Sequence, residues 1–124
     1  MSAKIILLVG AVNGGLCVIL GAFGSHALQS RLTPEMSGIW STAVQYHFYH
    51  ALGLLLLGTL ALHWPASGLL RTSAWLMLAG IVLFSGSLYL LALTGSRWLG
   101  AITPLGGAAL IAAWVVLCLS ILRS

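Results

Sequence analysis

The chain has 124 residues, of which 60% are apolar and only 5% are charged, and its formal net charge is +4. Soluble domains carry about 25% charged residues, so this composition lacks the charge that keeps a folded surface in water. It excludes a soluble globular domain and indicates a membrane protein.

Four stretches of 18 or more residues carry no charge, and each is long enough to cross a bilayer. We therefore predict an all-α fold, an integral membrane four-helix bundle that forms a single domain over residues 1–124. The expected helices cover about 4–27, 34–63, 69–93 and 104–122. No residues remain for a separate soluble domain.

The basic residues lie at expected helix ends or in connections: Lys4, Arg31, Arg71, Arg97 and Arg123. Residues placed in this way anchor helices and set their orientation. Because they form no single patch, we predict no nucleic-acid partner, and membrane lipids are the expected surroundings. The amino terminus, Lys4, Arg71 and Arg123 outnumber the basic groups on the other side. This bias predicts a multi-pass protein of the bacterial inner membrane with both termini in the cytoplasm.

Small residues recur on one face of the first helix, at steps of 4, 3, 4 and 4: Gly10, Gly14, Cys17, Gly21 and Ser25. Small residues let helix backbones approach closely in lipid. We expect Gly10, Gly14 and Gly21 to pack against another helix of the same chain, with a homo-oligomer or another membrane protein left open as a partner. Asn13 borders this face, and its amide needs a partner on a neighbouring helix.

The second helix has a strong start in Thr33-Pro34-Glu35. Thr33 is expected to cap the helix, Pro34 fits the first helical position, and Glu35 meets the positive end of the helix dipole. We interpret Glu35 as a capping residue rather than a catalytic one. A helix over 34–63 is about 45 Å long, so its first turns should lie in the interface of a bilayer whose core is about 30 Å thick.

Hairpin connectivity places most of the polar side chains in one half of the bilayer, which the orientation makes the periplasmic half. Polar groups at this depth face the bundle interior or pair with one another. The opposite half should hold almost only aliphatic residues. The polar set consists of His26, Gln45, Tyr46, His47, Tyr49, His50, Ser85, Ser87, Tyr89, Thr94 and Thr103.

Helical geometry selects the members of this set that should turn inward. We expect Tyr46 and His50 to face Ser85 or Tyr89, whereas His47 points about 100° away from Tyr46. The residues assigned to a polar network or ligand site are His26, Gln45, Tyr46, His50, Ser85, Ser87, Tyr89 and Thr103.

Three interpretations of this cluster remain, in decreasing order of preference. The first is a hydrogen-bond network that fixes helix register. The second is a pocket or pathway for a small polar molecule, a proton or a lipid headgroup, because histidine can change its charge near neutral pH. The third is a metal or haem site that uses His26, His47 or His50. The membrane segments supply no carboxylate, so we predict no metal and no cofactor.

No catalytic residues are assigned. The run Phe84-Ser85-Gly86-Ser87 does not match a nucleophile elbow, and no phosphate-binding glycine loop is present. A single acidic residue excludes catalysis by paired carboxylates. Cys17 and Cys118 fall inside apolar segments, where cysteines pack as small apolar residues.

Several stretches resemble the family called domain of unknown function 423, which includes bacterial YgdD-like inner-membrane proteins and the eukaryotic transmembrane protein 256 group. They are GAFGSHAL at 21–28, WSTAVQYH at 40–47, LFSGSLYLLALTG at 83–95 and LGAITPLGG at 99–107. Ser25 departs from this pattern, since the family has alanine there. The resemblance implies a four-helix integral membrane protein and supplies no activity.

We therefore expect a small inner-membrane protein with a structural or interaction role and no enzymatic activity. The alternative is a small transporter, or a binder of a small polar ligand or lipid, that works through the polar cluster.

Overall fold

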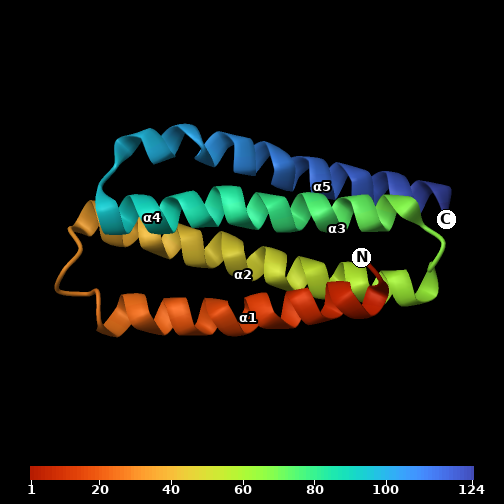
Figure 1. Cartoon of the computed structure of the whole chain (residues 1–124), viewed down its shortest axis with the longest axis horizontal. Coiled ribbons are helices and arrows are strands. Elements are labelled where there is room, and N and C mark those ends of the chain that lie inside the picture. The colour runs from red at the N-terminus through yellow and green to blue at the C-terminus, as the bar shows by residue number, and fades with distance from the viewer.

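Helices are the only regular elements in the computed structural model, which describes all 124 residues (Figure 1). In chain order they are α1 (Ala3–His26), α2 (Pro34–His63), α3 (Gly68–Gly80), a π-helical turn (Ile81–Ser85), α4 (Gly86–Thr94), a 3₁₀ turn (Arg97–Ala101) and α5 (Thr103–Arg123).

The elements from α3 to α4 form one continuous rod, so the molecule consists of four antiparallel rods (Figure 1). The predicted all-α four-helix fold is confirmed. The expected bounds 34–63 match α2, and those of the other rods are correct to within one residue at each end. The π-helical turn inside the third rod was not predicted.

Side-chain caps define the starts of α1, α2 and α3, where the capping residues are Ser2, Thr33 and Ser67. The Ser2 hydroxyl accepts a hydrogen bond from the Ile5 amide at 3.3 Å, and the Thr33 hydroxyl accepts one from Met36 at 3.2 Å. Pro34 opens α2 and Glu35 lies in its first turn, as the sequence predicts. At the C-terminal end of the third rod, Gly95 adopts a left-handed conformation with φ 71°, which terminates α4 at little steric cost.

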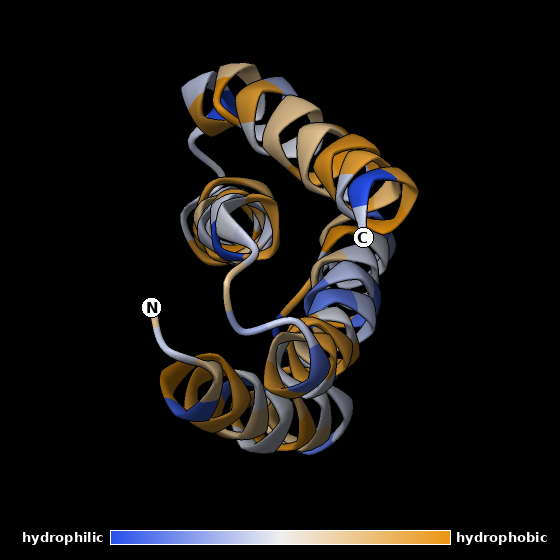
Figure 2. Cartoon of the chain, turned by 90° about the vertical axis from the view of Figure 1, so that its right-hand side faces the viewer, coloured by the Kyte–Doolittle hydropathy of each residue, from blue (hydrophilic) through white to orange (hydrophobic).

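The rods follow one another across the bundle in the order α1, α2, α3–α4 and α5. Helix α1 packs mainly on α2, α2 also contacts the third rod, and α5 packs on α3 and the π-helical turn. Consequently α1 and α5 lie at opposite edges of the molecule (Figures 1 and 2). The apolar core lies where α2, α3 and α5 meet, and its fully buried members include Leu54, Leu57, Leu70 and Met77.

Three of the rods are long and apolar enough to cross a membrane: α1, the rod Gly68–Thr94 and the segment Arg97–Arg123. Helix α2 is not among them, because its His, Tyr and Gln side chains lower its hydropathy. It nevertheless runs beside the others along the bundle, with both chain termini at the same end (Figure 1). We therefore expect α2 to cross wherever its neighbours cross.

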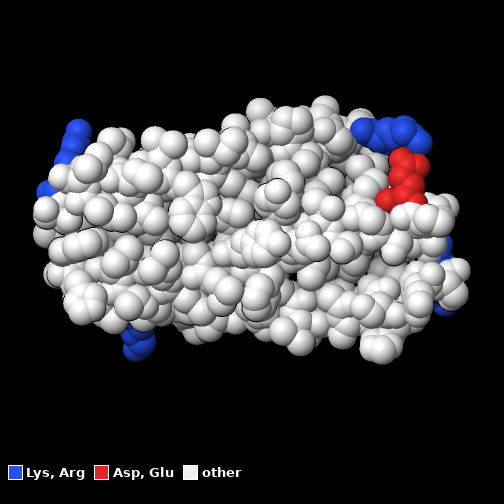
Figure 3. Space-filling model, turned by 180° about the vertical axis from the view of Figure 1, so that it is seen from behind, with Lys and Arg blue, Asp and Glu red and all other residues white.

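The surface fits this arrangement. Large apolar side chains such as Leu8, Val18, Val82 and Ile111 are exposed, and apolar residues extend around the outer sides of the helices (Figure 2). The charged side chains gather at the two ends of the molecule and leave a long uncharged band between them (Figure 3). A lipid bilayer is the solvent that suits such a band.

Helix α5 touches the third rod backbone to backbone at Gly106. A Cβ atom there would come within 2.7 Å of the Leu83 carbonyl carbon and the Phe84 Cα. Only glycine fits this contact. At the next position, Gly107, a Cβ would meet only the Phe84 ring, at 3.7 Å.

The substitution Gly106→Ala should therefore lower the free energy of unfolding by about 2 kcal/mol, because α5 must move away from the third rod. Gly107→Ala is the matched control and should be neutral or slightly stabilising, since alanine has the higher helix propensity. Thermal unfolding in detergent, followed by circular dichroism, measures both. Equal midpoints for the two variants would contradict this packing.

Candidate functional site

A chain of hydrogen bonds runs through the bundle interior from α4 to α1, with His47 of α2 at its centre. The His47 ring is 4% exposed. Its Nδ1 lies 2.9 Å from the Tyr89 hydroxyl oxygen, and its Nε2 lies 2.8 Å from the Asn13 Oδ1. The Asn13 amide in turn donates to the Val9 carbonyl at 2.8 Å. The predicted interhelical bond of Asn13 is therefore present.

The partners determine which ring nitrogen of His47 carries the proton. The Asn13 Oδ1 can only accept, so His47 donates from Nε2. Nδ1 must then accept from the Tyr89 hydroxyl. Both ring nitrogens of His47 are therefore satisfied when the imidazole is neutral.

A second set of bonds surrounds His50 and ties α2 to α5. The Trp114 indole N–H donates to the His50 Nε2 at 3.0 Å. The His50 Nδ1 donates to the Tyr46 carbonyl at 2.7 Å, one turn back along the same helix. This ring is therefore also neutral, but with its proton on Nδ1. Trp114 is not among the residues predicted for the site.

Hydroxyl groups around the π-helical turn supply further cross-links. The Ser85 hydroxyl, on the last residue of the turn, donates to the Ala43 carbonyl of α2 at 2.8 Å. The Ser87 and Thr103 hydroxyls lie 2.6 Å apart and join α4 to the start of α5. The turn thus brings polar side chains to both neighbouring helices.

The structure divides the predicted site residues into two groups. Five are buried or half-buried and take part in these bonds: His50, Ser85, Ser87, Tyr89 and Thr103. Three have exposed side chains that make no hydrogen bond within the chain: His26, Gln45 and Tyr46, of which only Tyr46 takes part, through its backbone carbonyl. The prediction that one cluster collects all eight residues is therefore not what the geometry shows.

The expectation that Tyr46 turns inward is wrong. Its side chain is 40% exposed and packs against the Phe84 ring at 4.9 Å, whereas His47 points into the bundle. The reason is the buried stripe of α2, which recurs at steps of 3, 4, 3 and 4 and consists of Trp40, Ala43, His47, His50 and Leu54. This stripe is visible in the sequence and would have identified His47.

The opposite half of the bundle is less aliphatic than predicted. The buried Ser73 hydroxyl donates to the Ala113 carbonyl at 2.7 Å, and the Ser67 and Ser120 hydroxyls lie 3.1 Å apart. Both contacts join α3, or the connection before it, to α5. Serine cross-links therefore occur in both halves.

The glycines of α1 differ in how closely they approach α2. A Cβ at Gly10 would lie 3.0 Å from the Leu55 amide nitrogen of α2, and one at Gly21 would lie 3.4 Å from the Val44 side chain. Gly14 has no neighbouring atom within 4 Å of that position. Packing within the chain therefore explains Gly10 and Gly21 but not Gly14.

No three His, Cys, Asp or Glu side chains come together in a geometry that could hold a metal ion. Two of the three imidazoles considered for a metal or haem site are also engaged elsewhere, since both ring nitrogens of His47 and of His50 are hydrogen-bonded. Cys17 is buried, Cys118 is exposed, and both are free thiols.

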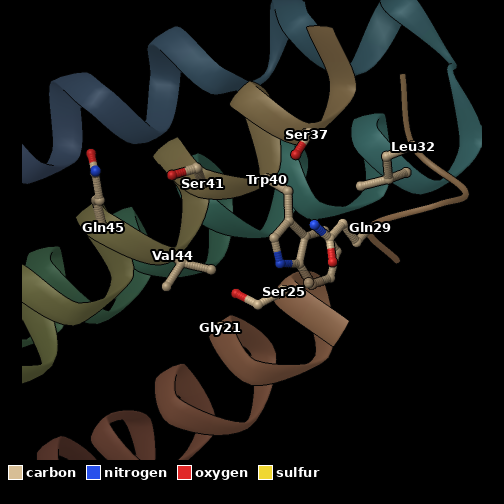
Figure 4. Close-up of a pocket in the computed structure, with 10 residues that line it drawn as sticks. Gly21, Ser25, Gln29, Leu32, Ser37, Trp40, Ser41, Val44 and Gln45 are labelled. Carbon is tan, nitrogen blue, oxygen red and sulfur yellow. The ribbon is translucent and has the colours of Figure 1, made fainter. Parts of the chain in front are cut away.

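Two main surface cavities are present, and neither is lined by His47, His50 or Tyr89. One, of about 400 Å³, lies between the end of α1 and the start of α2 (Figure 4). The other, of about 490 Å³, lies at the opposite end, around the connection between α2 and α3.

Comparison with known proteins places the chain. The family model described as "Protein of unknown function (DUF423)" matches residues 20–107. The chain belongs to this family. It is 48% identical to the UPF0382 membrane protein YwdK of Bacillus subtilis over 120 residues. These residues make up 97% of this chain and 98% of the relative.

Other relatives agree with this assignment. A UPF0382 membrane protein of Staphylococcus epidermidis is 44% identical over 97% of both chains, and one of Staphylococcus aureus is 39% identical over 94% of both. No solved structure matches the chain. Membership of the DUF423 family therefore identifies a membrane protein but assigns it no activity.

The opposite tautomers of the two buried rings give a spectroscopic prediction. In protein labelled with ¹⁵N at histidine, His47 should show its proton on Nε2 and His50 on Nδ1, because their partners allow no other neutral form. Nitrogen NMR in lipid measures this directly. His47→Gln and His50→Gln assign the signals. The same tautomer at both positions, or a doubly protonated ring, would contradict the deduced networks.

Proposed function

We propose that this DUF423 protein is a structural or interaction component of the membrane, and that its buried polar side chains hold four helices in one register. The observation that carries this proposal is their complete pairing. No buried side-chain nitrogen or oxygen atom lacks a hydrogen-bond partner. The bonds through His47 join α1, α2 and α4, and those through His50 join α2 to α5.

The energetics support a role in register. An interhelical hydrogen bond in a membrane contributes only about 0.6 kcal/mol on average. Sliding a helix by one turn, however, would leave imidazole, indole and amide groups unpaired in hydrocarbon, at a cost of a few kcal/mol for each group. The networks therefore discriminate against wrong registers more strongly than they stabilise the right one.

A passage or ligand site through the same cluster has less support. The two main cavities lie elsewhere, and both imidazoles use both nitrogens within the chain. We likewise propose no enzymatic role, because the sequence matches no nucleophile elbow and has only one acidic residue.

We further propose that the protein lies in the bacterial cytoplasmic membrane with both termini in the cytoplasm. Lys4, Arg71 and Arg123 belong to the end of the bundle that holds the termini, and Arg31 and Arg97 belong to the other end. With the terminal amine, the first end has the larger positive charge, and that end remains on the cytoplasmic side.

The variant His50→Phe tests the structural role. It fills a similar volume but leaves the Trp114 indole N–H without an acceptor, so the free energy of unfolding should fall by about 1–3 kcal/mol. Thermal unfolding in detergent provides the measurement. Thr59→Val is the control, because the Thr59 hydroxyl bonds only within its own helix. An unchanged unfolding midpoint for His50→Phe would contradict the structural role.

A further inference from the structure

The cavity between α1 and α2 is lined by an unusual set of side chains. Its polar members come from the end of α1, from the connection and from one face of α2, and they are Ser25, Gln29, Ser37, Ser41 and Gln45. Figure 4 shows the Ser25 and Gln29 side chains beside the Trp40 ring, with Ser41 and Gln45 farther along α2. We call this cavity the α1–α2 cleft.

The hydrogen-bonding state of this cleft differs from that of the bundle interior. All five polar side chains are exposed, and none of them makes a hydrogen bond within the chain. The neighbouring Thr42, in contrast, donates to the Gly38 carbonyl of its own helix at 3.1 Å. The α1–α2 cleft therefore gathers polar groups that are free to bond a molecule from outside the chain.

The cleft also reaches into the membrane. Ser37, Ser41 and Gln45 lie about 4.5, 10.5 and 16.5 Å along the helix from Pro34. If α2 extends equally beyond both faces of a core about 30 Å thick, Gln45 lies well below the surface. An unpaired amide at that depth is costly. A polar occupant that enters from the interface would remove this cost.

The lining specifies the chemistry of the occupant. No Lys, Arg, His, Asp or Glu lines the cleft, so it offers no counter-charge to an ion. Amides and hydroxyls can both donate and accept hydrogen bonds, which suits a group with several hydroxyls. A charged phosphate or ammonium group would be poorly compensated here.

One wall of the cleft is rigid. The Trp40 indole N–H donates to the Leu20 carbonyl at 3.0 Å, and the ring packs edge-on against Tyr89 at 4.8 Å. A side chain at Gly24 would collide with this ring. A fixed aromatic wall beside a few polar groups is typical of a small-molecule site.

We propose that the α1–α2 cleft binds an uncharged, polyhydroxylated group, such as a sugar. This goes beyond the structural role, because none of the five polar side chains takes part in the interior networks. The group can be the headgroup of a neutral glycolipid or a free sugar, and both present the same chemistry to the cleft.

The experiment uses full-length protein purified in an amine-oxide detergent, since maltoside and glucoside detergents carry the proposed ligand chemistry themselves. Native mass spectrometry then measures the retention of galactosyl diacylglycerol and, separately, of phosphatidylcholine with the same acyl chains. Free methyl galactoside is added as a competitor. We expect retention of the galactolipid at least about tenfold above that of phosphatidylcholine.

The variant Ser25→Ala/Gln29→Ala should reduce galactolipid retention by about tenfold while its unfolding midpoint stays unchanged. The control Thr59→Val/Thr72→Val removes two hydroxyls that bond within their own helices and should retain the galactolipid like the unaltered protein. Methyl galactoside is also offered alone at millimolar concentration: its binding without retention of the galactolipid identifies a free-sugar site, whereas retention of the galactolipid identifies a lipid-headgroup site. Equal retention of both lipids, binding of neither the galactolipid nor free methyl galactoside, or no effect of the cleft variant would overturn the proposal.

Discussion

The pairing of two imidazole rings inside a lipid-embedded bundle is the interaction on which the rest of this structure depends. Each ring has two nitrogens that need partners, and no water is available in hydrocarbon to supply them. His47 finds its partners on α1 and α4, and His50 finds one on α5. Helix α2 is therefore the hub to which each of the other rods is tied.

The hydrogen bond between α2 and α5 depends on a close backbone contact elsewhere in the bundle. The Trp114 indole reaches His50 because α5 lies close to the third rod, and that closeness depends on Gly106 against Leu83 and Phe84. The contact falls within the π-helical turn, where Ser85 also bonds α2. Such turns often occur at functional sites. Here the turn places a backbone contact and a hydroxyl cross-link at the same level of the bundle.

Most of the fold could be predicted from the sequence. The uncharged lengths and the Thr33-Pro34 start are local signals, and the predicted helix bounds agree with the structure to within one residue. The π-helical turn, Ile81–Ser85, which packs against α5, was not predicted. The site was only partly predictable. His50, Ser85 and Tyr89 carry polar groups that must be paired, but their partners depend on helix rotation.

The expectation about Tyr46 failed because of the way α2 is rotated in the bundle. The polar residues of α2 indicate a rotation that turns Tyr46 inward. The buried stripe follows the apolar and aromatic residues instead, and it turns His47 inward. Trp114 resembles an ordinary lipid-facing tryptophan until its N–H is seen to meet His50. The α1–α2 cleft could not be predicted from the sequence, because it exists only once α1 and α2 are placed together.

Two proposals are made for this molecule. The hydrogen-bonded polar groups of the interior hold the helices in register, and the polar groups of the α1–α2 cleft bind a ligand. Both descriptions require α2 to cross the bilayer beside three more apolar rods. A thiol-accessibility measurement tests this most directly, with single cysteines at Ser30 and Ala66 in a background that carries Cys17→Ala and Cys118→Ala. An impermeant reagent applied to intact cells should label only one of the two positions, and the other should react only after permeabilisation. Labelling of both positions from the same side would show that α2 does not cross, and the account would then be wrong.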